Sequence, residues 1–147
     1  FKLDTEGSDK RYAFCLPASD PACPRLAVAE SPIDALSLAT LEKRTGGPWQ
    51  NCYYLSLSGT APNALLQFLR DHPAVSQISL CLDNDKAGLV GMDRLEQAIR
   101  ADPALAAQVT LLCRNPPPAE YGKDYNEFLT ALVRMERGAQ HGREAAR

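Results

Sequence analysis

The sequence predicts an α/β protein of the three-layer, Rossmann-like kind, with a mainly parallel sheet of about four strands plus a short leading strand. Apolar runs of strand length alternate along the chain with amphipathic, helix-like segments, and this alternation is typical of βαβ units. The apolar runs are mostly continuous, as expected for strands that are buried on both faces. The 147 residues, of which 45% are hydrophobic, are enough for one packed domain.

The strands are expected where apolar residues are bounded by turn signals. The first expected segment is the short leading strand, and the other four belong to the parallel sheet: residues 11–17, 25–30, 52–58, 76–83 and 107–114. Glu30 ends the second of these segments and Asp83 ends the fourth. Connections between parallel strands are right-handed, so helices are expected on both faces of the sheet.

Four helices are expected from amphipathic segments, at residues 31–47, 60–73, 86–102 and 123–137. In the first of them, Ser31 is suited to the N-cap and Pro32 to the first helical position. The expected buried face of this helix consists of apolar-leaning residues at helical spacing: Ile33, Leu36, Thr40 and Leu41.

The chain is expected to divide into three parts. Residues 1–24 form a leading segment with its strand, residues 25–137 form the α/β domain, and residues 138–147 form a flexible tail. The chain begins with Phe1 rather than methionine. We therefore expect the leading segment to be the end of a preceding region of a longer protein.

Composition excludes several classes of function. Lys and Arg total 16 against 18 Asp and Glu, so no overall positive field attracts nucleic acid, and such contacts need a local patch, a metal ion or another domain. The five cysteines include no C-x-x-C pair, which argues against a zinc site. Cys52, Cys81 and Cys113 lie in or beside apolar runs and are expected in the core of a reduced, cytoplasmic protein. No apolar run is long enough to span a membrane, so no membrane partner is expected.

Carboxylates follow two of the predicted strands. Glu30 ends one strand, while Asp83 and Asp85 follow another. Because ligands bind at the carboxyl edge of a parallel sheet, these side chains are expected to meet there. Crowded carboxylates raise one another's pKa, and a cation relieves the repulsion. Oxygen ligands without His or Cys indicate Mg²⁺ or a related hard ion such as Mn²⁺. The alternative is that the Asp-Asn-Asp turn only caps the next helix.

Phosphate contacts are expected at the same edge. The turn Ser58-Gly59-Thr60 joins a strand to a helix, and a glycine turn with helix N-terminal amides can approach a phosphate. Lys86 follows the aspartate pair. The alternatives are an ordinary strand-to-helix turn and a lysine that only pairs with the aspartates.

A later segment, "GKDYNEF" at residues 122–128, adds Lys123 as a phosphate contact and Asp124 as an acidic group. The alternative role of Asp124 is that of a helix N-cap. The sequence contains no G-x-S-x-G or P-loop pattern, so neither a hydrolase nucleophile nor a Walker-type nucleotide site is expected.

Four motifs occur in order between residues 26 and 130: "VAESPIDALSL", "SLSGTA", "DNDKAG" and "KDYNEFL". Together they resemble the Toprim domain, and they are closest to its bacterial primase branch. Ser31-Pro32 departs from that pattern, which has glycine after the glutamate. The segment "EGSDKRYAFCLP" is similar to Toprim domains in primase-like proteins of plasmids and other mobile elements.

This resemblance implies roles for individual residues. Asp83 and Asp85 would bind Mg²⁺, Glu30 would be a general acid/base or a further metal ligand, and Asp124 would be an auxiliary acidic residue. The implied activity is Mg²⁺-dependent nucleotidyl transfer, as in primer synthesis, with single-stranded DNA, nucleoside triphosphates and upstream domains of the same chain as partners. Two alternatives are a Toprim nuclease and a non-catalytic module that binds metal or phosphate.

Overall fold

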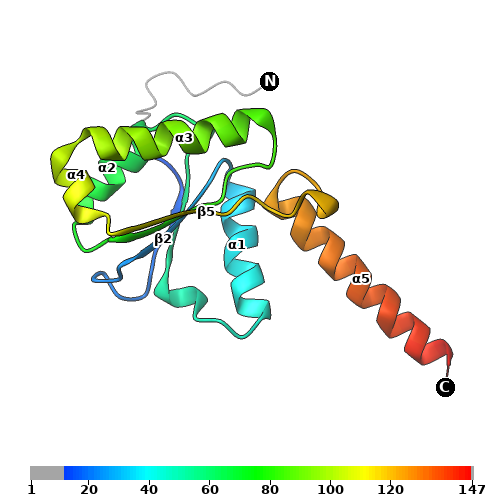
Figure 1. Ribbon diagram of the computed structural model, residues 1–147. Coiled ribbons are helices and arrows are strands. Elements are labelled where there is room, and N and C mark those ends of the chain that lie inside the picture. Colours follow the sequence, from blue (N-terminus) through cyan, green and yellow to red (C-terminus); the bar gives the residue numbers. More distant parts are fainter. Residues whose placement is uncertain (1–11, 147) are drawn as a thin grey trace.

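A computed structural model describes residues 12–146. This part of the chain folds around one five-stranded sheet (Figure 1). The strand order across the sheet is β1-β3-β2-β4-β5. The strands are β1 (Cys15–Leu16), β2 (Arg25–Ala29), β3 (Tyr53–Ser56), β4 (Gln77–Leu80) and β5 (Leu111–Arg114). β1 is antiparallel to β3, and every other pairing is parallel. The predicted fold class, a mainly parallel sheet with a short leading strand, is confirmed.

Helices cover both faces of this sheet. The longer elements are α1 (Pro32–Arg44), α2 (Asn63–Asp71), α3 (Lys86–Ala101), α4 (Pro103–Gln108) and α5 (Tyr125–Ala145), and the 3-10 turns are η1 (Trp49–Asn51) and η2 (Ala119–Tyr121). Figure 1 shows α3 along one side of the sheet, α1 on the other, and α5 projecting away from the body. Within residues 12–146, no helix has the length and apolar character that crossing a membrane requires.

The two faces of the sheet are packed differently. One face buries large side chains against α2, α3 and α4, including Leu55, Ile78 and Leu80. The other face packs small residues of β2 and α1 together, such as Ala29 and Ala35. Successive residues of a strand point to opposite faces, so β2 contributes to both cores and lies at the centre of the domain.

The predicted buried face of α1 is wrong. Ile33 and Leu36 are 55% and 46% exposed, whereas the helix buries a stripe of small and polar residues: Asp34, Ala35, Ser37 and Ala39. Small side chains allow the helix to lie close to the alanines of β2. Ile33 and Leu36 are therefore turned away from the sheet, whereas Leu38 packs at the edge of the small-residue core.

Three further differences concern the end of the sheet. The sequence predicted one strand over residues 107–114, but α4 occupies Pro103–Gln108, and β5 begins only at Leu111. Asp102 caps α4 by accepting hydrogen bonds from Ala104 N and Leu105 N, a signal that an Asp-Pro pair gives in sequence. Cys113 was expected in the core, but on the edge strand β5 it is exposed, while Cys52 and Cys81 are buried as expected.

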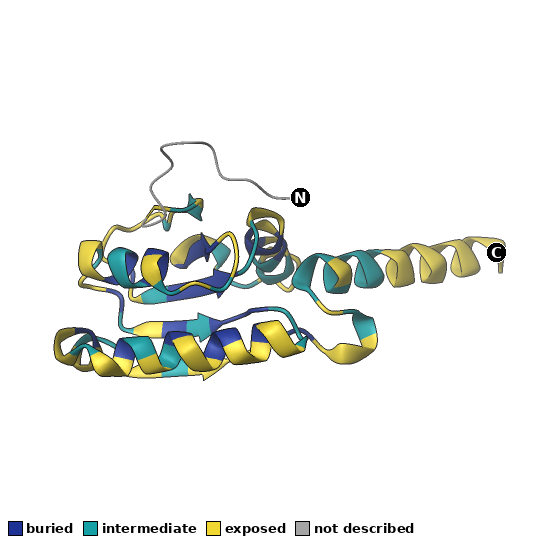
Figure 2. Cartoon of the chain, turned by 90° about the horizontal axis from the view of Figure 1, so that it is seen from above, coloured by how far each residue is buried: buried dark blue, intermediate teal, exposed yellow. Residues whose placement is uncertain are grey.

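The two ends of the chain were assigned from sequence to a leading segment and a flexible tail. Residues 1–11 lie outside the described residues, and the described part of the leading strand is the two-residue β1. At the other end, α5 continues through residues 138–145 as exposed helix (Figure 2). The first turns of α5 are half-buried, and it packs there against α1.

Candidate metal and phosphate site

The strand order brings the ends of β2 and β4 together. These strands pair in parallel up to Val28 and Leu80, and Cys81 N then donates a hydrogen bond of 2.8 Å to Val28 O. One step further on, Asp83 N donates to Glu30 Oε1 at 3.2 Å. Two carboxylates that are 53 residues apart in sequence are thus neighbours at the carboxyl edge of the sheet.

A cavity of about 270 Å³ opens at this edge, and we call it the acidic cavity. Its lining comes from both strand ends, the start of α1, the turn after β3 and the loop before α5: Glu30, Ser31, Asp34, Ser58, Gly59, Asp83, Lys123 and Asp124. Six of the nine site residues predicted from sequence line the acidic cavity. The other three, Thr60, Asp85 and Lys86, do not.

The acidic cavity raises the pKa of two carboxylates, Asp83 and Glu30. Partial burial is the largest cause for Asp83, followed by repulsion from Glu30, Asp34, Asp124 and Asp85, and together these raise its pKa to about 7. The pKa of Glu30 is also raised, chiefly by burial, although its hydrogen bond from Asp83 N opposes the shift. Ionising both groups is therefore unfavourable without a cation.

Asp85 and Asp124 each cap a helix. Asp85 Oδ1 accepts a hydrogen bond of 2.7 Å from Gly88 N in the first turn of α3, and Asp124 Oδ1 accepts one of 2.8 Å from Glu127 N in the first turn of α5. The capping alternative is therefore correct for one oxygen of each side chain. Because a carboxylate has two oxygens and several acceptor sites, capping and metal binding are compatible.

The turn after β3 is held against β2. Gly59 N donates to Glu30 O at 2.9 Å, and both Ser58 (φ 53°) and Gly59 (φ 137°) have positive φ angles. Thr60 lies beside Gly91 of α3, where its Cβ would be 2.9 Å from an added Cβ. Thr60 therefore packs the turn against α3, while Lys86 is exposed at the start of that helix.

Replacing Gly59 by alanine is expected to lower the free energy of unfolding by roughly 1–2 kcal/mol, because a φ of 137° is strained for any residue with a Cβ. No atom lies within 4 Å of the new methyl group, so the cost comes from the backbone alone. Urea unfolding measures this change in the free energy of unfolding. Gly142→Ala, in open space on α5, is the control, and equal stability changes in the two variants would contradict the expectation.

The residues at the acidic cavity fit Mg²⁺ held partly by substrate. Within the described range, residues 12–146, no three Asp, Glu, His or Cys side chains are close enough to hold a metal ion by themselves. Mg²⁺ does not require such a cage, because it retains several waters and binds one or two carboxylates plus substrate phosphates. Glu30 and Asp83 share this cavity and have raised pKa values, so both can supply carboxylate oxygens to such an ion.

The sequence did not single out two residues at this edge. Asp34 lines the acidic cavity and is only 5% exposed, and Asn84 bonds the loop that carries Lys123. In sequence, Ser31 and Asp34 match a helix capping box. This local role accounted for Asp34 and gave no signal of a contact with a distant segment.

Comparison with known proteins gives a family match and a distant relative. A family model described as Toprim-like matches residues 27–129, and Toprim domains bind Mg²⁺ and occur in enzymes that act on DNA, primases and nucleases among them. An uncharacterized protein of Bacillus anthracis is 28% identical over 153 residues, which cover 99% of this chain but 43% of that protein. The chain thus spans less than half the length of this relative. No solved structure matches the chain. Because the family model covers more than half of the sequence, the chain belongs to the Toprim-like family.

Proposed function

We propose that this domain carries out Mg²⁺-dependent nucleotidyl transfer in a cytoplasmic, primase-like protein of a plasmid or other mobile element. The observation that carries the proposal is the pairing of Glu30 with Asp83 in a cavity that Lys123 also lines. Carboxylates and a lysine in one cavity suit a metal-bound phosphate. The partners would be a single-stranded DNA template, nucleoside triphosphates and upstream domains of the same chain.

The carboxylates at the site would have different roles. Asp83 and Asp85 would hold Mg²⁺, and Glu30 would be a further ligand or a general acid/base. Bound Mg²⁺ would neutralise the charge that develops on the transferred phosphoryl group. Asp124 would be an auxiliary acidic group at the cavity wall.

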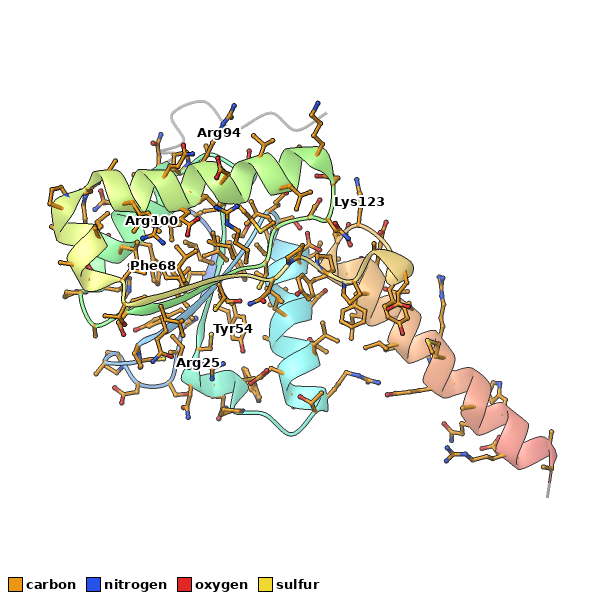
Figure 3. All side chains as sticks on the ribbon, viewed as in Figure 1. Arg25, Tyr54, Phe68, Arg94, Arg100 and Lys123 are labelled. Carbon is orange, nitrogen blue, oxygen red and sulfur yellow. The ribbon has the colours of Figure 1, made fainter. Side chains whose placement is uncertain are left out.

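Phosphate contacts would come from the turn after β3 and the loop before α5. Ser58 offers a hydroxyl, Gly59 a turn without a side chain, and Lys123 a cation. The backbone amides of Ser58 and Gly59 already donate to Ser56 Oγ and Glu30 O. Figure 3 shows Lys123 between the starts of α3 and α5. Thr60 and Lys86 lie outside the cavity lining. We assign them to more distant phosphates of a longer substrate.

Primer synthesis on single-stranded DNA, with nucleoside triphosphates and Mg²⁺, tests the proposal in the longest native protein that contains this chain. We expect synthesis that Asp83→Asn reduces at least a hundredfold, because one metal ligand is lost. Asp71→Asn, at an exposed position of α2, is the matched control and should change the rate less than twofold.

The alternatives give different results in the same assay. Cleavage of DNA or RNA in the absence of nucleotides, lost in Asp83→Asn, would identify a nuclease. A third outcome is neither synthesis nor cleavage, together with no anomalous density beside Asp83 in crystals soaked with Mn²⁺. The domain would then be a non-catalytic module. Robust primer synthesis by residues 1–147 alone would contradict our expectation that upstream domains supply the template contacts.

A further inference from the structure

We propose that Asp34 and Asn84 are positioning residues that hold the loop at residues 122–126 against the acidic cavity. Through this loop they place Lys123 opposite Glu30 and Asp83. The inference rests on the proposed function, because it assigns Asp34 and Asn84 a part in the phosphate contact made by Lys123. We call the two residues the clamp.

Asp34 holds the loop from the side of α1. Its Oδ1 accepts a hydrogen bond of 3.1 Å from Asn126 N, which lies 92 residues away in the first turn of α5. Its Oδ2 accepts one of 2.6 Å from Ser31 Oγ. Both carboxylate oxygens of this buried side chain are thus bonded to protein groups. That arrangement suits a residue that fixes a neighbouring segment.

Asn84 contacts the same loop from the turn after β4. Its backbone N donates to Lys123 O at 2.6 Å, and its side-chain Nδ2 donates to Pro117 O at 3.1 Å. Asn84 lies between Asp83 and Asp85. The turn that presents the carboxylates is therefore bonded directly to the segment that presents the lysine.

The loop itself is locally organised, so the clamp positions it as a unit. Lys123 N donates to Glu127 Oε2 at 2.6 Å, and Asp124 caps α5 through Glu127 N. Gly122 has a φ of 129°, and an added Cβ there would overlap the Glu127 carboxylate. A displacement of the first turn of α5 would therefore move Lys123 with it.

The start of α5 also contacts the segment after β5, where Tyr125 Oη donates a hydrogen bond of 2.7 Å to Asn115 O. Helix α5 has no fully buried residue, and its ion pair with α1 joins Arg44 and Glu136, more than two turns beyond the loop. Because its first turns are only half-buried, polar contacts add to the apolar packing that usually docks a helix. The bond from Asn126 N to the buried Asp34 carboxylate is one of the polar contacts that orient the loop.

A double-mutant cycle tests whether Asp34 acts through Lys123. The probe is inorganic pyrophosphate with Mg²⁺, and its affinity is measured by calorimetry on the full chain. We expect Asp34→Ala and Lys123→Ala each to weaken pyrophosphate binding about tenfold. Lys123→Ala removes the charged phosphate contact itself, and Asp34→Ala removes the bond that places this lysine. The double variant is expected to bind no more weakly than Lys123→Ala.

The conservative variant separates positioning from metal binding. Asp34→Asn keeps a carbonyl oxygen for Asn126 N but loses the charge, so its affinity for pyrophosphate should remain within about twofold of wild type. The Mg²⁺ concentration that half-saturates each variant in the absence of pyrophosphate should stay within about threefold of the wild-type value. Additive losses in the cycle, or an Asp34→Asn variant as impaired as Asp34→Ala, would overturn the inference.

Amide hydrogen exchange keeps the test independent of the proposed function. If wild-type protein fails to bind pyrophosphate, the proposed function is wrong, but the clamp still predicts faster exchange of the Asn126 amide in Asp34→Ala and wild-type exchange in Asp34→Asn. Unchanged exchange in Asp34→Ala overturns the clamp. If Asp34→Ala does not fold, Asn84→Ala replaces it. This variant loses only the bond to Pro117 O, and its threefold expected loss should also vanish in the Lys123→Ala background.

Discussion

Asp83→Asn is expected to raise the unfolding temperature of the metal-free protein at pH 8 and to abolish its further rise with Mg²⁺. The Asp83 carboxylate has a pKa of about 7 in the folded chain, against an ordinary value of 3.8. Removing its charge relieves the cost of burying that charge and then the repulsion from the neighbouring carboxylates. Since the side chain is partly exposed, we discount the full shift and expect about 1–2 kcal/mol, or about 3–6 °C.

The pH dependence of this effect follows from the direction of the shift. Between pH 3.8 and about 7, folded Asp83 retains a proton that the unfolded chain releases. Wild-type stability therefore falls as pH rises through this window. The raised pKa of Glu30 adds to the same trend. The advantage of Asp83→Asn should be absent near pH 3.5, grow through the window and level off above pH 8.

Thermal unfolding in EDTA and in Mg²⁺, over pH 4–9, measures both parts of the prediction. Mg²⁺ at about ten times its dissociation constant should stabilise wild type by about 1.4 kcal/mol and leave Asp83→Asn unchanged. Asp71→Asn, away from the acidic cavity, should behave like wild type. A variant less stable than wild type in EDTA at pH 8 would show that the Asp83 carboxylate has a stabilising partner.

Gly88→Ala is expected to destabilise the protein by about 2 kcal/mol, although alanine favours helices. Gly88 is in the first turn of α3, and an added Cβ would lie 2.8 Å from the Asp83 carbonyl carbon and overlap its oxygen. Inserting a methyl group into such a contact costs about 1–3 kcal/mol. The shift would also move Asp83 and weaken the bond from Gly88 N to Asp85, so Mg²⁺ binding should weaken too.

A second helical glycine gives the matched control. Gly138 of α5 has nothing within 4 Å of an added Cβ, so Gly138→Ala should stabilise the helix by about 0.5–1 kcal/mol. Urea unfolding of both variants separates the intrinsic helix preference of alanine from the steric contact with the Asp83 carbonyl group. Stabilisation by both substitutions would mean that α3 moves away from the Asp83 turn without cost.

Local signals in the sequence were sufficient for the helix starts at the site. Ser31, Asp85 and Asp124 are N-caps in the structure, each with a side-chain acceptor for an amide in the first turn. Capping depends on residues three positions apart, so sequence spacing describes it fully. The same local interpretation concealed Asp34, because its second bond is to a residue 92 positions away.

The face of α1 shows where local patterns fail. Its apolar residues suggested one buried face, but the helix buries alanine and serine and exposes Ile33 and Leu36. Which face is buried depends on how closely the helix approaches the sheet, and this distance depends on the alanines of β2. The helix sequence carries no information about those partners.

The sequence by itself determined the order of strands and helices, the parallel sheet, and the acidic residues after two of its strands. These features depend on periodicity and on turn and cap chemistry, which act over a few residues. Only the tertiary structure decided that β2 lies beside β4. This adjacency places Glu30 against Asp83, and its repulsion adds to burial in raising the pKa of Asp83. The tertiary structure also decided that Asp34 and Asn84 hold the Lys123 loop, since hydrogen bonds between distant segments depend on how the whole domain packs.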